Sequence, residues 1–272
     1  MSFLCTAVIA AVWLSAAMTG AWLAQCVTHN CGWVDAIWSG ATGFGAAFCA
    51  LLPAPGAASA GPRAWLAAAM AAVWGLRLAW HIARRTAGGG AEDARYADFR
   101  REWGAAFEPR LFGLLMVQAA CAWVLVVSVL LAARNPAPSL RAADLAGVLL
   151  LVGSVLGEAR ADAQLRRFRA EKSGRVCDTG LWAWSRHPNY FFEFLGWCAF
   201  PLLAIDALGR YPVGFLSLAA PAMMFWLLRY VSGVPPLEKS MLARRGDAFR
   251  AYQARVSVFF PRPPASHVRN AT

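Results

Sequence analysis

The stretch Leu111–Ala133 contains no Asp, Glu, Lys or Arg, and this feature limits the possible folds most. About 20 consecutive apolar residues are enough to cross a hydrocarbon core of about 30 Å as a helix. The whole chain of 272 residues is 59% hydrophobic and 15% charged, with a mean hydropathy of +0.45. Soluble domains are about 45–50% apolar and about 25% charged. The composition therefore excludes a soluble single-core protein and a disordered chain, and the long unbroken runs exclude an outer-membrane barrel with alternating strands.

Seven predominantly apolar blocks follow one another, and prolines stand near most of their ends, as expected at helix boundaries. The blocks are Phe3–Val27, Trp33–Leu52, Ala64–Ala83, Leu111–Ala133, Ala142–Leu165, Tyr190–Ile205 and Val213–Val231. The first block lacks a basic segment before it, so we interpret it as a retained helix and not as a cleaved signal peptide. The sequence predicts an all-α polytopic membrane protein with seven transmembrane helices in one domain, residues 1–272.

The basic residues indicate an orientation. The chain has 26 Lys and Arg against 15 Asp and Glu, a net charge of +11. Most of these cations lie between the third and fourth blocks, between the fifth and sixth, and after the seventh. Cytoplasmic loops carry such an excess, so we expect the N-terminus outside and the C-terminus in the cytoplasm. These loops are too short for a nucleic-acid-binding domain. We therefore expect membrane lipid and an anionic small molecule as partners, and no nucleic acid.

Metal and disulfide chemistry find little support. The seven cysteines form no CxxC pair, and the four histidines fit neither HxxxH nor HExxH spacing. We predict no metal site. The glycine-rich stretch Gly40–Gly45 has the wrong order for a GxGxxG motif and lies inside an apolar block, which excludes a Rossmann unit.

Charged residues inside the apolar blocks are the candidates for chemistry, because each is costly in lipid unless it faces a cavity or a partner. The fifth block carries Glu158 and Asp162, whose four-residue spacing places them on one helical face. Arg166 and Arg169 continue near that face. Two carboxylates followed by two guanidiniums could bind ribose hydroxyls at one end and phosphates at the other. Intrahelical ion pairs are the alternative interpretation.

The segment from Trp182 to Glu193 is the strongest local signal. Pro188 suits the first position of a helix, and a helix N-terminus beside Arg186 attracts anions. Asn189 and Glu193 lie on one face and could together bind a carboxamide or a sugar hydroxyl. An aromatic belt at the membrane interface is the alternative, although a belt does not require Asn189 or Glu193.

The stretch from Arg175 to Glu193 resembles the C-terminal signature of the steroid 5-alpha-reductase superfamily, and most closely its bacterial branch of unknown function. The segment Asn30–Trp38 with Asp35, the loop Arg84–Tyr96 with Glu92, Asp93 and Arg95, and Leu237-Glu238-Lys239 fit the same pattern. The resemblance extends from about residue 30 to residue 264. The Arg186–Tyr190 core also resembles isoprenylcysteine carboxyl methyltransferases.

The resemblance implies a seven-span enzyme of the bacterial inner membrane that binds NADPH in a cytoplasm-facing cavity, mainly within residues 142–264. It implies that Glu158 and Asp162 lie near the adenosine or ribose and that Arg85, Arg169 and Arg175 bind the phosphates. It further implies that Asn189 and Glu193 lie near the nicotinamide half of the cofactor. The cofactor-binding residues implied in this way are Arg85, Glu158, Asp162, Arg166, Arg169, Arg175, Arg186, His187, Asn189, Tyr190, Glu193 and Glu238.

The implied reaction is hydride transfer to an activated C=C bond of an apolar substrate, such as a steroid-like enone. Animal steroid reductases polarise the carbonyl with a glutamate and a tyrosine. Asp35, protonated by desolvation, is the candidate counterpart of the glutamate and our predicted catalytic residue. Trp74 stands where the tyrosine is expected. Two alternatives remain open: a membrane methyltransferase using S-adenosylmethionine, which has no phosphate to bind, and a non-enzymatic transport or lipid-binding protein.

Overall fold

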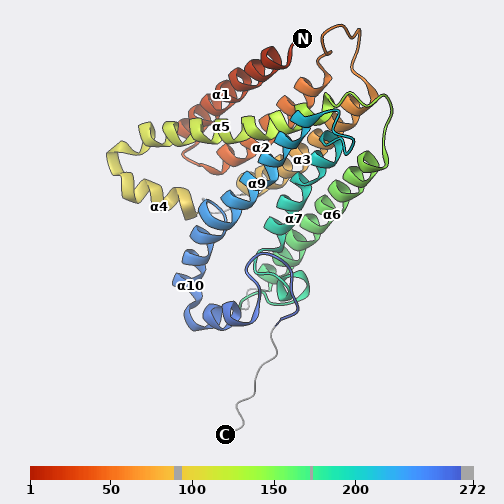
Figure 1. The fold of residues 1–272 in the computed structure, drawn as a ribbon. Coiled ribbons are helices and arrows are strands. Elements are labelled where there is room, and N and C mark those ends of the chain that lie inside the picture. Colours follow the sequence, from red (N-terminus) through yellow and green to blue (C-terminus); the bar gives the residue numbers. More distant parts are fainter. Residues whose placement is uncertain (89–93, 172–173, 265–272) are drawn as a thin grey trace. The chain divides into compact units, whose positions relative to one another are not determined.

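The computed structural model describes residues 1–88, 94–171 and 174–264, and within them every regular element is helical (Figure 1). The elements in chain order are α1 (Phe3–Thr28), α2 (Gly32–Leu51), α3 (Pro62–Ala87), α4 (Ala94–Trp103), η1 (Gly104–Ala106), α5 (Phe107–Ala133), α6 (Ala142–Ala170), η2 (Gly180–Ala183), α7 (Pro188–Trp197), α8 (Ala199–Ala204), η3 (Pro212–Leu218), α9 (Ala219–Trp226), η4 (Leu227–Val231) and α10 (Val234–Arg255).

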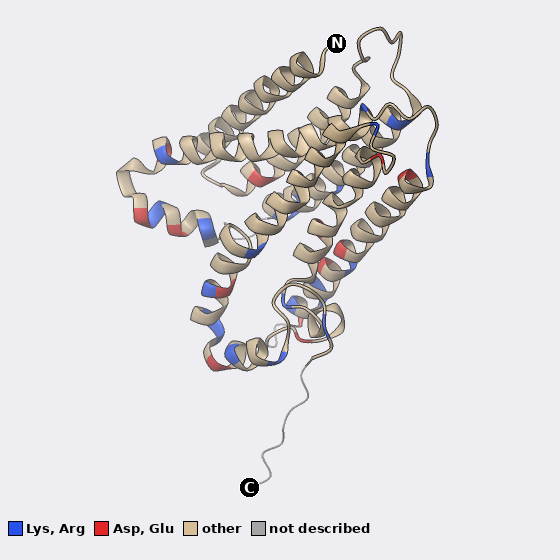
Figure 2. Cartoon of the chain, viewed as in Figure 1, with Lys and Arg blue, Asp and Glu red and all other residues tan. Residues whose placement is uncertain are grey.

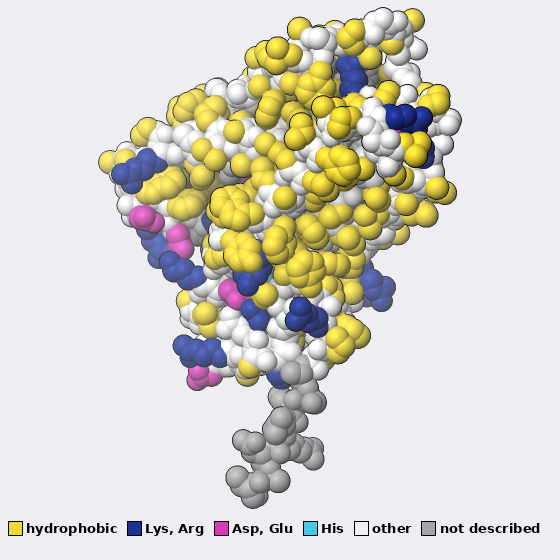
Figure 3. Space-filling view, viewed as in Figure 1, with side chains coloured by type: hydrophobic (Ala, Val, Ile, Leu, Met, Phe, Trp, Pro, Cys, Tyr) yellow, Lys and Arg dark blue, Asp and Glu magenta, His cyan; other side chains and the backbone are white. Residues whose placement is uncertain are grey.

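Six helical stretches of the described chain are long and apolar enough to cross a membrane, which supports an integral membrane protein. They correspond to the first five predicted blocks and the last one. Large hydrophobic side chains point outward from them, such as Leu76 (70% exposed) and Trp80 (66% exposed). Hydrophobic side chains cover large parts of the face in Figure 3, as a lipid-facing surface requires.

The predicted span 190–205 has a different form from the others. It consists of the two short helices α7 and α8, with Cys198 between them and Pro201 inside the second. A proline removes the backbone donor that would bond the carbonyl four residues earlier, so Pro201 favours the interruption between α7 and α8. A seventh membrane crossing stays a prediction.

The chain divides into two compact units. Unit 1 comprises residues 1–148 and 198–223, and unit 2 comprises residues 149–197 and 224–272. Helices α1, α2, α3 and α5 pack on one another in unit 1. Helices α2 and α3 approach closely where Gly43 meets Gly75, because a Cβ on Gly43 would lie 2.7 Å from the Gly75 Cα. Small residues at such crossings allow close backbone packing in membrane helices.

A buried ion pair fastens the loops at one end of unit 1. Arg63, in the first turn of α3, is 5% exposed, and Asp144, in the first turn of α6, is 1% exposed. Their closest contact is 2.9 Å. Arg63 also donates to the carbonyl oxygens of Asn135, Ala137 and Ser139. Together these bonds satisfy the buried guanidinium, as a charge away from water requires.

Unit 2 is built on the contact between α6 and α7. The Phe192 ring of α7 lies over Gly157 of α6, so closely that a Cβ on Gly157 would lie 2.4 Å from it. One turn further along α7, a Cβ on Gly196 would lie 3.6 Å from side-chain atoms of Leu151 and Ser154 of α6. This contact sets the rotation of both helices and determines which of their side chains face one another.

The last apolar block ends in an irregular helix. Its final turn, η4, is a π-helix in which Ser232 N–H and Gly233 N–H both donate to the Leu227 carbonyl. A π-turn inside a helical segment is often found at functional sites. Helix α10 then bends at Gly246, whose φ of 50° is readily adopted only by glycine. Figure 2 shows that α10 carries many of the charged residues of unit 2.

Candidate functional site

Two buried carboxylates lie on one face of α6 in unit 2. Glu158 is 7% exposed and Asp162 is 8% exposed, and Ser154, one turn earlier, is 2% exposed. The four-residue spacing predicts this shared face. Neighbouring positions Val152 and Leu156 are exposed. The carboxylates therefore face the interior of the protein and not the lipid side of α6.

Helix α7 contributes a third buried carboxylate. Glu193 is 7% exposed and accepts a hydrogen bond from Trp197 Nε1 at 3.1 Å. It follows Phe192, the residue that packs over Gly157 of α6. Both helices therefore have buried carboxylates in the turns where α6 and α7 touch. Acidic groups inside apolar helices are uncommon and indicate function more often than structure.

The segment before α7 is fixed by a network around Glu238 of α10. Glu238 accepts from Arg186 Nε at 2.7 Å and from Gln253 Nε2 at 2.7 Å, and His187 Nε2 lies 3.0 Å from its Oε1. Arg186 Nη1 donates to the carbonyls of Gln253 and Val256. Its Nη2 donates to Glu238 Oε2 at 3.3 Å, so three nitrogens of Arg186 bond protein acceptors. In this structure Arg186 and Glu238 organise the segment, and their predicted contact with a cofactor stays a prediction.

His187 has a distinctive environment. It is 3% exposed, and its ring lies parallel to that of Tyr190 at 5.4 Å between centroids. Burial lowers the pKa of His187, although the nearby Glu238 carboxylate raises it. With Nε2 facing that carboxylate, a neutral imidazole has its proton there. The Nδ1 atom then offers a lone pair, and it is buried without a partner among the described residues.

The remaining predicted residues of this region differ in exposure. Asn189 and Tyr190 are half-buried in the first turn of α7. Arg166, Arg169 and Arg175 are exposed, the first two in the last turns of α6. Unit 2 thus contains every predicted cofactor residue except Arg85, which is exposed in the last turn of α3 in unit 1.

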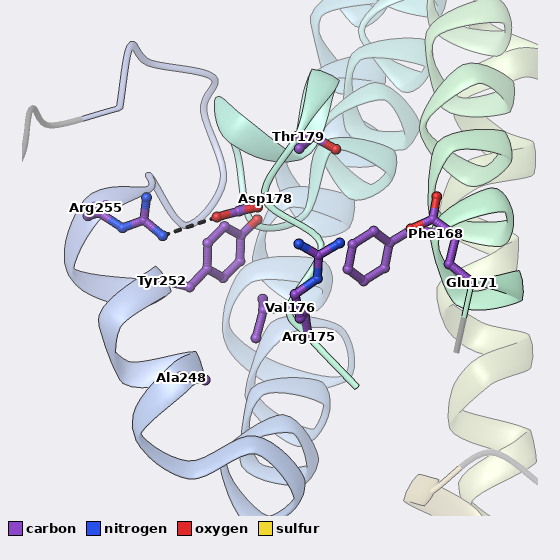
Figure 4. Close-up of a pocket in the computed structure, with 9 residues that line it drawn as sticks. All are labelled: Phe168, Glu171, Arg175, Val176, Asp178, Thr179, Ala248, Tyr252 and Arg255. Atoms are coloured by element: carbon purple, nitrogen blue, oxygen red, sulfur yellow. Dashed lines mark hydrogen bonds and ion pairs between the residues drawn. The ribbon is translucent and has the colours of Figure 1, made fainter. Parts of the chain in front are cut away.

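A cavity of about 410 Å³ lies in unit 2 beyond the end of α6 (Figure 4). Its lining residues are Phe168, Glu171, Arg175, Val176, Asp178, Thr179, Ala248, Tyr252 and Arg255. Arg255 donates to Asp178 at 3.2 Å. The Tyr252 hydroxyl is engaged outside the cavity, because it donates to the Trp182 carbonyl at 2.6 Å. The cavity lining therefore contains two guanidiniums, two carboxylates and two aromatic rings, of which that of Tyr252 is almost completely buried.

Asp35 belongs to a separate cluster in unit 1. Its carboxylate accepts from Arg95 Nη2 at 2.8 Å and from the Tyr96 hydroxyl at 3.0 Å. Gln118 Nε2 donates to the Tyr96 oxygen at 3.4 Å, and Tyr96 is 1% exposed. The sequence predicts Asp35 as a protonated donor. In the structure it is an acceptor, because a guanidinium and a phenol both donate to it, and the Tyr96 hydroxyl is the donor beside it.

Comparison with known proteins gives the family. Residues 21–256 match the family described as "Protein of unknown function (DUF1295)". The chain belongs to the DUF1295 family. The predicted relationship to a family of unknown function is confirmed at this level, and the match includes residues of both units.

A curated relative of this DUF1295 chain is the "Uncharacterized protein C594.04c" of Schizosaccharomyces pombe. The two are 32% identical over 96 residues, which make up 33% of this chain and 24% of the relative. The chain thus spans about a quarter of the length of that protein. No solved structure matches the chain.

Sequence reasoning missed several residues of these clusters. A tyrosine was expected at the position of Trp74, which is buried and packs against Trp38, while Tyr96 was noted only as the end of a loop and was given no role. Asp178 and Arg255 are ordinary polar residues near the ends of their segments, and no spacing in the sequence links them. Gln253 was missed for the same reason. Glu92 and Asp93 of the resemblance lie outside the described residues.

Proposed function

We propose that this DUF1295 protein is a membrane-embedded reductase that uses NADPH to reduce an activated C=C bond in an apolar substrate, of which a steroid-like enone is an example. The observation that carries the proposal is the set of three buried carboxylates, Glu158, Asp162 and Glu193, on the touching turns of α6 and α7. Carboxylates in this position suit a ligand rich in hydroxyl and amide groups. The resemblance of Arg175–Glu193 to the steroid 5-alpha-reductase superfamily supports the same ligand.

The charges around the end of α6 fit a phosphorylated cofactor. Arg166, Arg169 and Arg175 are exposed cations within one short part of the chain, and guanidiniums bind phosphate oxygens in bidentate fashion. S-adenosylmethionine has no phosphate, so a methyltransferase has no use for these arginines. In the proposed site, Glu158 and Asp162 bind ribose hydroxyls, the arginines bind phosphates, and Asn189 and Glu193 bind the carboxamide half.

NADPH, when bound, supplies the hydride. The protein contributes polarity at the substrate carbonyl, where negative charge develops as the β-carbon is reduced. The Tyr96 hydroxyl is our candidate for the donor to that oxygen. Asp35 and Gln118 hold this hydroxyl, and Arg95 holds Asp35. In this proposal Asp35 holds the Tyr96 hydroxyl before substrate binds, and the substrate oxygen then replaces Asp35 as the acceptor of its proton.

The topology belongs to the same proposal. In this proposal the segment 190–205 is the seventh crossing, which places the N-terminus outside and the C-terminus in the cytoplasm of a bacterial inner membrane. The arginines at the end of α6 and the charged helix α10 then lie on the cytoplasmic side, where NADPH is available. This orientation follows from the distribution of Lys and Arg.

Ligand-dependent thermal unfolding of the full chain in detergent tests the proposal. A ligand that binds only the folded state raises the melting temperature. We expect NADPH to raise it, S-adenosylmethionine to leave it unchanged, and Arg169→Ala to weaken the NADPH effect. An effect of S-adenosylmethionine alone would assign the site to a methyltransferase, and no effect of either ligand on well-folded protein would overturn the reductase.

A further inference from the structure

The cavity at the end of α6 contains features of two different ribose-binding sites. In dinucleotide sites an acidic side chain binds a free ribose 2′-hydroxyl, whereas an arginine accommodates a 2′-phosphate. Here both types lie at one cavity, and they are bonded to one another: Arg255 Nη2 is 3.2 Å from Asp178 Oδ2. Figure 4 shows this pair at the cavity beside Tyr252. Neither residue belongs to the predicted set of cofactor contacts.

The size and chemistry of the cavity suit one nucleotide. A volume of about 410 Å³ is within the range of small-molecule sites, about 300–1,000 Å³. Phe168 offers apolar ring surface for a base, while the buried Tyr252 ring forms part of the wall and its hydroxyl is bonded to the Trp182 carbonyl. Arg175 adds a second cation. The cavity walls come from the last turn of α6, from the loop after it and from the second half of α10, beyond its bend at Gly246.

We infer that the Asp178–Arg255 pair sets the preference of this cavity for a 2′-phosphorylated adenosine over an adenosine with a free 2′-hydroxyl. This inference rests on the proposed function, since it assigns the cavity to the adenosine half of the cofactor. Arg255 donates to the 2′-phosphate, and Asp178 accepts from a 2′-hydroxyl and repels a phosphate. The two residues therefore act in opposite directions on the same discrimination.

The ion pair between them is weak enough to be exchanged. The Arg255 side chain is 31% exposed and that of Asp178 is 39% exposed. Pairs with this exposure contribute little to stability, because water and salt screen the two charges. A 2′-phosphate bears more charge than a carboxylate and can replace Asp178 as the partner of Arg255, while a 2′-hydroxyl leaves the pair intact. Tyr252 is 2% exposed, and its hydrogen bond to the Trp182 carbonyl ties this part of α10 to the segment before α7. The cavity wall therefore stays in place during the exchange.

Binding of two small probes to the full chain in detergent tests the inference. The probes are adenosine 2′,5′-bisphosphate and adenosine 5′-monophosphate, and isothermal titration gives both dissociation constants. We expect wild type to prefer the bisphosphate, and Arg255→Gln to lower the affinity for it by about 10- to 100-fold, the usual range for a charged hydrogen bond. The affinity of the Arg255→Gln variant for the monophosphate should differ from that of wild type by less than about threefold. Asp178→Asn should raise the preference for the bisphosphate.

Arg250→Gln is the matched control, because Arg250 lies on the same half of α10 and pairs with the exposed Asp247, outside the cavity lining. It should leave both affinities unchanged. The inference is overturned if neither probe binds wild type, or if Arg255→Gln and Arg250→Gln have equal effects. The probes contain no nicotinamide, so discrimination between them without any reductase activity would refute the proposed reaction alone. Reduction with NADPH without discrimination by this pair would refute only the inference.

Discussion

Arg186 and Glu238 form a two-point ion pair across 52 positions of the sequence, with Arg186 Nε 2.7 Å from Oε1 and Nη2 3.3 Å from Oε2. Both side chains are 13% exposed. Since the same carboxylate also contacts His187 and Gln253, one acidic group of α10 fixes the residues that lead into α7. The pair therefore positions the start of the helix that carries Asn189 and Glu193.

Removal of this carboxylate should destabilise the protein strongly. Glu238→Ala leaves the Arg186 guanidinium without its ionic partner in a largely buried site, and breaking such a pair costs about 3–5 kcal/mol. Thermal and denaturant unfolding in detergent measure the effect. Asp247→Ala on the same helix is the control. Its carboxylate is 96% exposed and pairs only with Arg250 among the described residues, so a loss of at most about 0.5 kcal/mol is expected. Equal losses would contradict a structural role for Glu238.

The contact of α6 with α7 predicts that two glycine-to-alanine variants of α6 differ in stability. Gly157→Ala places a methyl group against the Phe192 ring at 2.4 Å and should cost about 1–3 kcal/mol as the ring is displaced. Gly153→Ala, one turn earlier, meets nothing within 4 Å. It should stabilise the helix by about 0.4–1 kcal/mol, because alanine loses less conformational freedom on folding. Unfolding of both variants under the same conditions is the measurement, and a neutral Gly157→Ala would show that α6 and α7 do not touch there.

The regular part of the fold was predictable from the sequence. Long uncharged runs such as Leu111–Ala133 have one stable solution in lipid, the helix, because each backbone polar group must be bonded within its own segment. The shared face of Glu158 and Asp162 followed from helical geometry. The division of 190–205 into α7 and α8 was missed, because the apolar run is continuous through Cys198, although Pro201 was a local signal for an interruption.

The side-chain clusters whose members are far apart in the sequence could not be predicted from local sequence patterns. Asp35 and Tyr96 are 61 positions apart, and nothing near either residue indicates the other. The sequence assigned Asp35 alone and gave it the role of proton donor. The role of a carboxylate depends on its neighbours, and here Arg95 and Tyr96 both donate to it. Asp178 and Arg255 went unnoticed for the same reason.

The Asp35 cluster predicts a separation of turnover from cofactor binding. Tyr96→Phe removes the hydroxyl proposed to stabilise charge on the substrate oxygen, and loss of one such donor typically lowers turnover by about 100- to 1,000-fold. Asp35→Asn should lower turnover less, because the amide oxygen can still accept from Tyr96. Both variants should bind NADPH with wild-type affinity. Enone reduction followed by NADPH absorbance, with the melting shift as the binding assay, checks this. Unchanged turnover in Tyr96→Phe would remove Tyr96 from the reaction.

The pH dependence of stability should report the buried His187. Its pKa is lowered below the ordinary value of 6.5, chiefly by burial, while Glu238 opposes the shift and the positive charges of Arg186 and Arg229 add to it. The folded state thus holds the imidazole neutral, whereas the unfolded state takes up a proton as the pH falls through about 6.5. The stabilisation is complete above that pH and decreases below it, by at most about 1.4 kcal/mol per pH unit, until the folded pKa is reached.

Replacement of the titrating ring isolates this contribution. His187→Gln keeps a polar group of similar length but has no proton to gain. The variant should therefore lose less stability than wild type between about pH 7.5 and about pH 5, a range that includes the ordinary histidine pKa of about 6.5. Melting temperatures of the two proteins across this range give the difference directly. Parallel curves would mean that His187 is protonated equally in both states and that burial does not control its charge. Converging curves, with wild type losing its advantage as the pH falls, are the expected result.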